Sequence, residues 1–155
     1  MHAMRRKDRE KDRTFGLCVL RKCEFATMAT TNEDGTPYCI PLSVVLVGED
    51  TIYFHCANDG HKMDNIRAQP KVCLSCVGDT QLRPEQFTTR YESAVVFGTV
   101  EIVQDDAERF LALEAFCAKY APNAENVTRE IYDRGFARVC ICKIKIESIS
   151  AKERE

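Results

Sequence analysis

The sequence lacks the features that mark several large classes of protein. No apolar run approaches the length of a membrane-spanning helix, and no apolar segment of the secretory type follows the charged N-terminus. We therefore expect a cytoplasmic protein that does not span a membrane. The net charge at pH 7 is only −2, which provides no electrostatic footprint for nucleic acid. Nucleic acid and membrane are thus not expected as partners.

Familiar catalytic and cofactor motifs are absent as well. No Ser-His-Asp or Cys-His arrangement stands out, and no Gly-rich turn of the dinucleotide-binding kind is present. The 155 residues suffice for one domain that buries roughly two-thirds of its unfolded surface. We expect a charged N-terminal arm over residues 1–14, one globular domain over 15–147 and a charged C-terminal tail over 148–155.

Nine cysteines are present, and we expect most of them to pack as small buried apolar residues. Without a secretory signal, a disulfide framework is not expected. Cys73 and Cys76 lie three apart in a strand-like run, so they face opposite sides of a sheet. Cys140 and Cys142 share a face, but two thiols make an incomplete metal site. We therefore predict no metal ion, and nothing flanking Cys56 indicates a thiol of lowered pKa.

The hydrophobic pattern predicts six strands, mostly antiparallel, joined by turns and helices. The strands are expected at residues 25–31, 38–47, 51–56, 71–77, 92–103 and 137–146, and the helices at 15–22, 60–68, 105–120 and 122–134. The first three strands would form a meander, residues 78–89 are polar and irregular, and Gly98 marks a bulge or a close backbone approach. This pattern favours a closed or split β-barrel with peripheral helices, too small to enclose a large ligand. A cofactor would lie on its outer surface, most economically at a dimer interface.

The most informative segment runs from Ile52 to Ile66, where a strand leads directly into a short helix. His61 and Lys62 occupy the first turn of this helix, although the positive end of the helix dipole repels cations. The arrangement is favourable if an anion lies between the free N–H groups and the two side chains, as phosphates do at helix N-termini. We therefore predict a phosphate cradle at Gly60-His61-Lys62. The alternative is that both side chains are ordinary surface residues.

Five segments follow one another in an order found in a known family. They are Tyr-Cys-Ile-Pro-Leu-Ser at 38–43, Thr-Ile-Tyr-Phe-His-Cys-Ala at 51–57, Gly-His-Lys-Met-Asp-Asn-Ile at 60–66, Gln-Pro-Lys-Val-Cys-Leu at 69–74 and Tyr-Glu-Ser-Ala-Val-Val-Phe-Gly at 91–98. In this order they resemble the pyridoxamine-5′-phosphate-oxidase-related, FMN-binding split-barrel superfamily. The opening at residues 4–9 and the blocks around His55 and His61 are most similar to its 5-nitroimidazole-resistance branch. The resemblance covers roughly residues 4–147 and implies a six-stranded antiparallel split β-barrel.

The resemblance also implies a cofactor, FMN, bound at the interface of a homodimer. The residues that it assigns to FMN are His61 and Lys62 at the phosphate, Pro41, Leu42 and Ser43 beside the isoalloxazine ring, and Tyr91 and Ser93 at the ring or the ribityl chain. Ser43, Tyr91 and Ser93 have structural roles as an equal alternative. His55 is a candidate for a place near the flavin, or else a histidine packed on the barrel face, and the catalytic residues remain open.

The function implied by the resemblance is that of an oxidoreductase. FMN would take a hydride from NAD(P)H and pass electrons to a small aromatic or nitro-aromatic acceptor. The basic residues with which the vitamin-processing oxidases hold their substrate lie in a C-terminal segment not found here, so oxidation of pyridoxamine phosphate is not expected. Two alternatives stay open. One is a flavin- or haem-binding module without turnover, with His55 or His61 on the iron, and the other is a non-enzymatic interaction protein.

Overall fold

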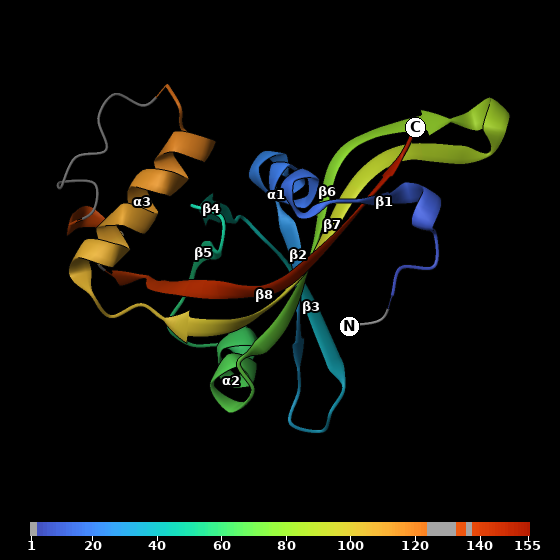
Figure 1. The fold of residues 1–155 in the computed structure, drawn as a ribbon. Coiled ribbons are helices and arrows are strands. Elements are labelled where there is room, and N and C mark those ends of the chain that lie inside the picture. Colours follow the sequence, from blue (N-terminus) through green and yellow to red (C-terminus); the bar gives the residue numbers. More distant parts are fainter. Residues whose placement is uncertain (1–2, 124–132, 136–137) are drawn as a thin grey trace.

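One strongly twisted antiparallel sheet makes up most of the protein, and the computed structural model describes residues 3–123, 133–135 and 138–155 of it (Figure 1). The strands are β1 (Glu10–Lys11), β2 (Ala26–Thr31), β3 (Pro37–Leu42), β4 (Val45–Val47), β5 (Thr51–Cys56), β6 (Lys71–Arg83), β7 (Thr88–Ile102) and β8 (Cys140–Arg154). The helices are α1 (Arg13–Lys22), α2 (His61–Ala68) and α3 (Asp106–Tyr120), with 3-10 turns η1 (Lys7–Arg9) and η2 (Pro84–Gln86). None of the described helices is long and apolar enough to cross a membrane.

The sheet runs in the order β3-β2-β6-β7-β8-β5-β4, with β1 beside β8. Its two edge strands, β3 and β4, do not pair with each other within the described residues, so the barrel is split and not closed. The predicted fold class, a mainly β split barrel with peripheral helices, is therefore confirmed. The strand count differs from six because the expected strand at 38–47 is two strands and because β1 is added.

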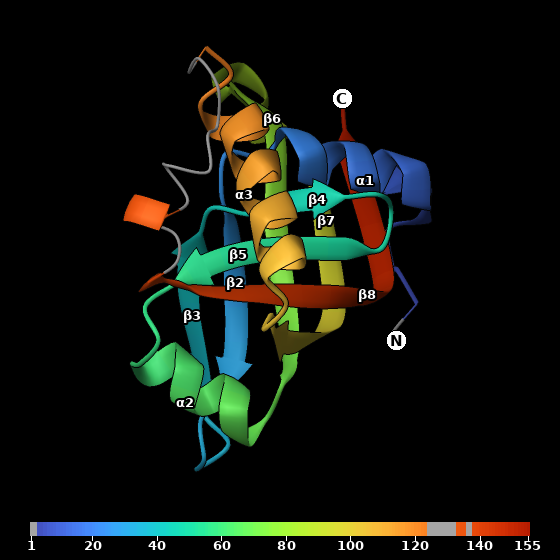
Figure 2. The same ribbon diagram turned by 90° about the vertical axis from the view of Figure 1, so that its left-hand side faces the viewer.

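Two groups of buried side chains hold the sheet and helices together. The main core joins α1 and α2 to the inner sheet face and includes Leu20, Met28 and Phe54, all fully buried. A second group lies under α3, where Phe116 packs with Tyr53 on the opposite face of β5. Figure 2 shows α3 running across β4 and β5, while α2 lies at the far end of the barrel. Asp105 caps α3 by accepting a hydrogen bond from the Glu108 N–H at 2.7 Å, as expected for this helix start.

The prediction of a three-strand meander is wrong, because the chain breaks at Ser43 and Val44. β3 pairs with β2 at one edge of the sheet, whereas β4 pairs with β5 at the other. The break is held by the end of α3. Lys119 donates to the Val44 carbonyl oxygen at 2.8 Å, and the Val44 N–H donates to the Tyr120 hydroxyl at 3.0 Å. The helix that makes this contact lies about 75 residues further along the chain. The sequence around residue 44 therefore does not reveal the break.

The sequence predicted an irregular segment at residues 78–89, but these residues form the outer end of a long hairpin. β6 and β7 pair from Thr80 with Tyr91 to Arg83 with Thr88 and turn through η2. Figure 1 shows the hairpin projecting beyond the body of the protein. Strands exposed on both faces carry polar side chains throughout, so their composition is that of a loop. Gly98 does mark a bulge, since the pairing of β7 with β8 shifts register between Phe97 and Gly98.

The last strand is longer than the residues 137–146 expected for it. β8 continues to Arg154 and pairs with β7 and β1, so residues 148–154 are strand where a tail was expected. Ala151 is buried, and Ile149 packs on the main core. The helix expected over 122–134 and the start of the expected last strand fall largely outside the described residues. The proposed domain boundaries stay a prediction.

Candidate functional site

The N-terminus of α2, where the phosphate cradle is predicted, is a helix end without a side-chain cap. The helix begins at His61, directly after Gly60, whose backbone angles of φ 120° and ψ 167° are reached almost only by glycine. The N–H groups of His61 and Lys62 have no partner within a helix that starts here. Two backbone donors therefore lie beside the two basic side chains.

The His61 ring is fixed by a chain of contacts to the β2–β3 hairpin. Its Nε2 lies 2.7 Å from Asn32 Oδ1, and its ring stacks on Tyr38 with 4.0 Å between centroids. Asn65 on α2 is buried and donates to both Asn32 Oδ1 (2.7 Å) and Thr30 Oγ1 (3.0 Å). Asn32 Oδ1 thus accepts from Asn65 and from His61 Nε2, which leaves His61 Nδ1 for another partner.

Lys62 is half-buried and has no counter-ion among the described residues. The acids nearest to it in sequence are directed elsewhere. Asp59 and Asp64 lie 3.7 Å and 3.5 Å from the Arg67 guanidinium, with which they form ion pairs. Within the part of the chain that the structure describes, no ion pair therefore compensates the positive charge of Lys62 at the start of α2. This is the electrostatic condition for binding an anion.

A second surface lies on the sheet face turned away from the main core, and we call it the outer face. One row of directly paired residues crosses it, namely Pro41, Thr27, Ser75, Val95 and Ser150 on β3, β2, β6, β7 and β8. The next row consists of Cys39, Ala29, Cys73, Phe97 and Ser148. Small, apolar and hydroxyl side chains dominate both rows. A flat aromatic ligand or another protein surface could pack on such a face.

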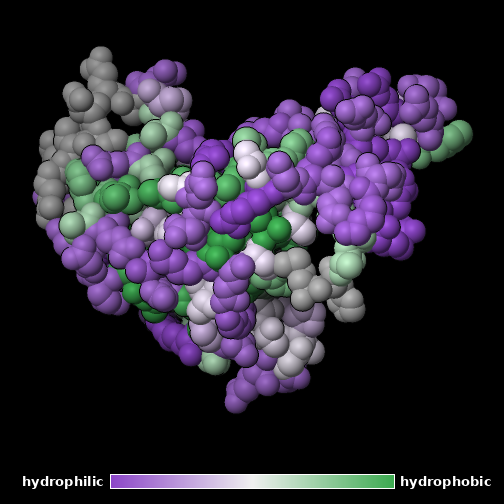
Figure 3. Space-filling view, in the orientation of Figure 1, coloured by the Kyte–Doolittle hydropathy of each residue, from purple (hydrophilic) through white to green (hydrophobic). Residues whose placement is uncertain are grey.

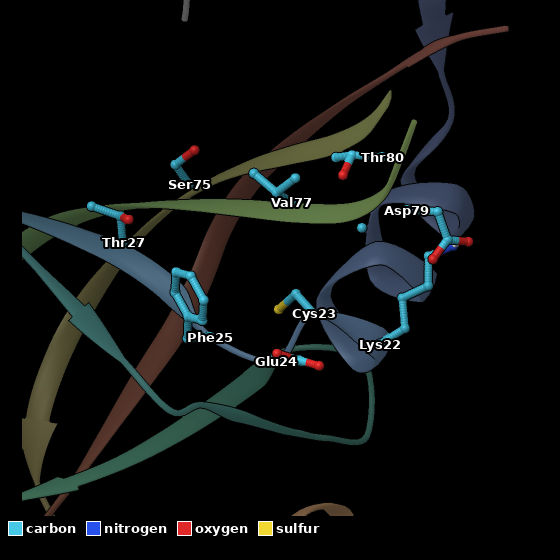
Figure 4. A pocket seen from close by; sticks show the side chains of 10 residues that line it. Lys22, Cys23, Glu24, Phe25, Thr27, Ser75, Val77, Asp79 and Thr80 are labelled. Atoms are coloured by element: carbon cyan, nitrogen blue, oxygen red, sulfur yellow. Dashed lines mark hydrogen bonds and ion pairs between the residues drawn. The ribbon is translucent and has the colours of Figure 1, made fainter. Parts of the chain in front are cut away.

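One hollow on the outer face has a volume of about 460 Å³ (Figure 4). Phe25 and Thr27 lie at one end of it, with Ser75 and Val77 on β6 behind them. Lys22 forms the other end, donating to Asp79 at 2.8 Å and pairing with Glu92. The hydrogen bonds to Asp79 and Glu92 raise the pKa of Lys22. The hollow therefore has an apolar end and a charged end.

A neighbouring hollow of about 470 Å³ contains Ser93, Val95, Ser150 and Lys152, and the N-terminal arm covers part of it through Met4 and Arg5. The space-filling view shows hydrophobic atoms gathered over the middle of the molecule, and the projecting hairpin is mostly hydrophilic (Figure 3). The two hollows lie on the same sheet face, since Val77 on β6 pairs with Ser93 on β7.

The structure brings some of the predicted site residues together and separates others. Pro41 and Ser93 lie on the outer face, as does Tyr91, two residues before Ser93 on the same strand. Leu42 points into the barrel, where it packs on the main core, and Ser43 is exposed just beyond the end of β3. His61 of the cradle stacks on Tyr38 of β3, but alternation along this strand places Tyr38 on the opposite face from Pro41, so the cradle and the outer-face residues lie on opposite sides of β3.

His55 lies apart from all of these residues. Its ring meets Phe116 of α3 edge-on at 4.9 Å between centroids, on the face of β5 that carries the second core group. Burial lowers the pKa of His55. This packing does not favour a position of His55 beside a ligand on the outer face. A place of His55 near the flavin stays a prediction.

Three thiols that the sequence did not connect meet at the ends of β5 and β8. The Sγ atoms of Cys56, Cys140 and Cys142 all lie within 4.8 Å of one another. A hydrogen bond from Cys142, together with the charge of Lys62, lowers the pKa of Cys56 to about 7. The expectation that Cys56 has no lowered pKa is therefore wrong, because its neighbours come from another strand and from α2.

Several residues of the site were missed by sequence reasoning. Asn32 and Asn65 belong to a turn and to a helix interior, and only the packing of α2 on the hairpin connects them. Thr27 and Ser75 carry a weak signal, since each is a polar residue between buried neighbours in a strand. Such alternation marks an outward-facing position but does not say what lies against it.

Comparison with known proteins identifies relatives of this fold. The family model described as pyridoxamine 5′-phosphate oxidase matches residues 17–153. A candidate 5-nitroimidazole antibiotic resistance protein from Bacteroides thetaiotaomicron is 22% identical with a TM-score of 0.77, over 92% of this chain and 84% of that one. The flavocytochrome Anf3 from Azotobacter vinelandii is 18% identical with a TM-score of 0.78, over 99% and 73%. A FAD-binding protein from Mesorhizobium loti is 23% identical with a TM-score of 0.69, over 95% and 98%. No curated protein matches the sequence.

Proposed function

The chain belongs to the pyridoxamine 5′-phosphate oxidase family, and from this membership we propose that it is an FMN-binding oxidoreductase. It would pass electrons from NAD(P)H to a small aromatic or nitro-aromatic acceptor. The single observation that carries the proposal is the first turn of α2, which has two backbone N–H groups without a partner in the helix, a fixed imidazole and an ammonium with no counter-ion among the described residues. A phosphate monoester is the anion that suits two cations and two N–H donors.

Each part of the proposed flavin site has a distinct task. Lys62 and the α2 N–H groups hold the phosphate, while His61 adds a donor through Nδ1 when it is protonated. Pro41 and Ser43 lie at the edge strand β3, whose outer side pairs with no other described strand and so keeps backbone groups free for the polar edge of a ring. When bound, FMN supplies the hydride chemistry. The protein binds and orients it.

The proposed assembly is a homodimer with one flavin at each side of the interface. The outer face of one subunit is shallow and leaves Phe25, Val77 and Phe97 largely exposed. A planar ring bound there would keep one face in water unless a second surface covered it. A second copy of the chain is the partner that family membership favours. The NAD(P)H donor and the acceptor would reach the flavin from the remaining opening.

The first test measures FMN binding to the purified protein, with the fluorescence of the flavin as the readout. We expect the double variant His61→Ala/Lys62→Ala to bind FMN at least tenfold more weakly than the natural protein. Lys62→Arg is the matched control, since it keeps the charge and should keep most of the affinity. Equal affinity in the double variant would show that the phosphate lies elsewhere.

Turnover is tested separately from binding. The FMN-loaded protein is mixed with NADH or NADPH without oxygen, and the flavin absorbance should bleach and then recover on adding a nitro-aromatic oxidant. Bound FMN that neither nicotinamide reduces would leave a flavin-binding module without turnover. A Soret band in the purified protein would favour haem, which the similarity to a flavocytochrome makes a specific alternative. The cytoplasmic location stays a prediction.

A further inference from the structure

Three cysteines form a compact, buried group at the ends of β5 and β8, beside the first turn of α2. Cys56 and Cys140 are direct partners across the two strands, and Cys142 lies two residues further along β8 on the same face. The Cys140 and Cys142 sulfurs are 3.7 Å apart. All three side chains are buried, and Cys56 is the most exposed at 9%. The Met63 thioether adds a fourth sulfur, 3.5 Å from Cys56 Sγ.

The spacing of the thiols suits a single metal ion. The centre of an equilateral triangle with sides of 4.8 Å, the widest spacing in this group, lies about 2.8 Å from each corner, against metal–thiolate bonds of about 2.3 Å. Each sulfur would therefore move inward by about 0.5 Å or less, which a small rotation about the Cα–Cβ bond within the same rotamer allows. The pairing of β5 with β8 therefore already holds the three thiols close to the positions that one metal ion requires.

The donor set points to a soft ion. The group contains three thiols and, within the described residues, neither an imidazole nor a carboxylate. Structural zinc is held by four ligands drawn from cysteine, histidine and carboxylates, and a buried thioether is a poor fourth ligand for it. Thiolate and thioether sulfur are typical ligands of soft ions such as Cu(I). Lys62 and Arg67 near Cys56, and Arg109 near Cys140, provide positive charge to offset three thiolates.

We propose that Cys56, Cys140 and Cys142 bind a soft monovalent metal ion of the Cu(I) type, with Met63 as a weaker fourth ligand. Binding releases the thiol protons to solvent and forms three metal–sulfur bonds without a change of oxidation state. Because Met63 belongs to α2, the ion joins this helix to the ends of β5 and β8. The proposal replaces the sequence-based expectation of no metal site, and it does not depend on FMN.

The test uses the reduced, metal-free full-length protein, titrated with Cu(I) without oxygen against a chromophoric Cu(I) chelator. We expect one tightly bound ion per chain and a thiolate-to-metal absorption band in the near ultraviolet. The variant Cys140→Ala/Cys142→Ala should bind at least a hundredfold more weakly. Met63→Leu should weaken binding by less than tenfold.

The matched control is Cys23→Ala/Cys76→Ala, which removes the chain's other pair of neighbouring buried thiols. This variant should bind Cu(I) as tightly as the natural protein. Copper X-ray absorption of the loaded natural protein gives a readout that needs no variant, and three sulfur neighbours at about 2.3 Å are expected. Nitrogen or oxygen ligands, or equal loss of affinity in both double variants, would overturn the site and leave the thiols as packing residues.

Discussion

His61 and Lys62 are neighbours at the start of α2, but the fold holds them very differently. The His61 ring is fixed between Asn32 and Tyr38, whereas no described residue accepts a hydrogen bond from the Lys62 ammonium. The fixed ring would orient a bound ligand, and the free ammonium would attract its negative charge. The sequence alone predicted both residues as ligands. It did not distinguish these tasks, because Asn32 and Tyr38 belong to a hairpin that is distant in sequence.

Asn65 tests whether the positioning of His61 matters. We expect Asn65→Ala to lower the free energy of unfolding by about 1–3 kcal/mol, because Thr30 and Asn32 lose a buried donor. FMN affinity should fall as well, by less than for the double variant, since Lys62 is untouched. Urea unfolding and flavin titration measure the two effects. Asp64→Ala is the control on the same helix, with its exposed pair to Arg67 worth at most about 1 kcal/mol.

At the scale of elements, sequence patterns correctly predicted the features of secondary structure that depend on neighbouring residues. The start of α2 beside His61 and the bulge at Gly98 were both predicted correctly, because each depends on backbone geometry within a few residues. The break at Val44 depends on Lys119 and Tyr120 and was missed. The β6–β7 hairpin was missed because a strand exposed on both faces has no apolar alternation to detect.

Gly98 is the position where a single methyl group should disturb the sheet most. A Cβ atom there would lie 2.4 Å from the backbone oxygen of Lys145, which cannot move without displacing β8. We expect Gly98→Ala to cost about 1–3 kcal/mol of stability in urea unfolding. Gly16→Ala is the contrast, because its nearest neighbour is the flexible end of Ile149 and alanine favours the helix. A larger loss at Gly16 than at Gly98 would contradict this account.

Glu147 links three strands and gives stability a defined dependence on pH. Lys71 of β6 and Thr99 of β7 both donate to its carboxylate, and these hydrogen bonds lower its pKa. A carboxyl whose pKa is lower in the folded state stabilises the fold above its unfolded pKa, and this contribution is lost as pH falls through the folded pKa. Glu147→Gln should therefore lower the urea midpoint at pH 6, and the difference from the natural protein should close as the pH falls through the lowered pKa of Glu147 in the folded state. Glu114→Gln on the exposed side of α3 should show no such closing gap.

At the scale of the whole molecule, the sheet presents two faces with different tasks. The inner face closes around the main core, and part of the other face is covered by α3 with the second core group beneath it. The outer face keeps Phe97 42% exposed among small side chains, close to both hollows. Large aromatic side chains in a patch without a cover mark contact surfaces. The same patch would carry the ring of the proposed flavin, so dimerisation and cofactor binding should depend on one another.

Phe97→Asp tests that dependence. A carboxylate buried in the dimer interface without a partner is costly. We therefore expect the variant to sediment at micromolar concentration with the mass of one chain, whereas the natural protein should sediment with the mass of two. FMN affinity should fall in parallel, since the partner subunit no longer covers the ring. Leu111→Asp is the matched control, because Leu111 on α3 is equally exposed at 42% but lies away from the outer face. It should change neither mass nor affinity. A natural protein that is monomeric with FMN bound would separate the cofactor site from any dimer, and a Phe97→Asp variant that stays dimeric would place the interface on another surface.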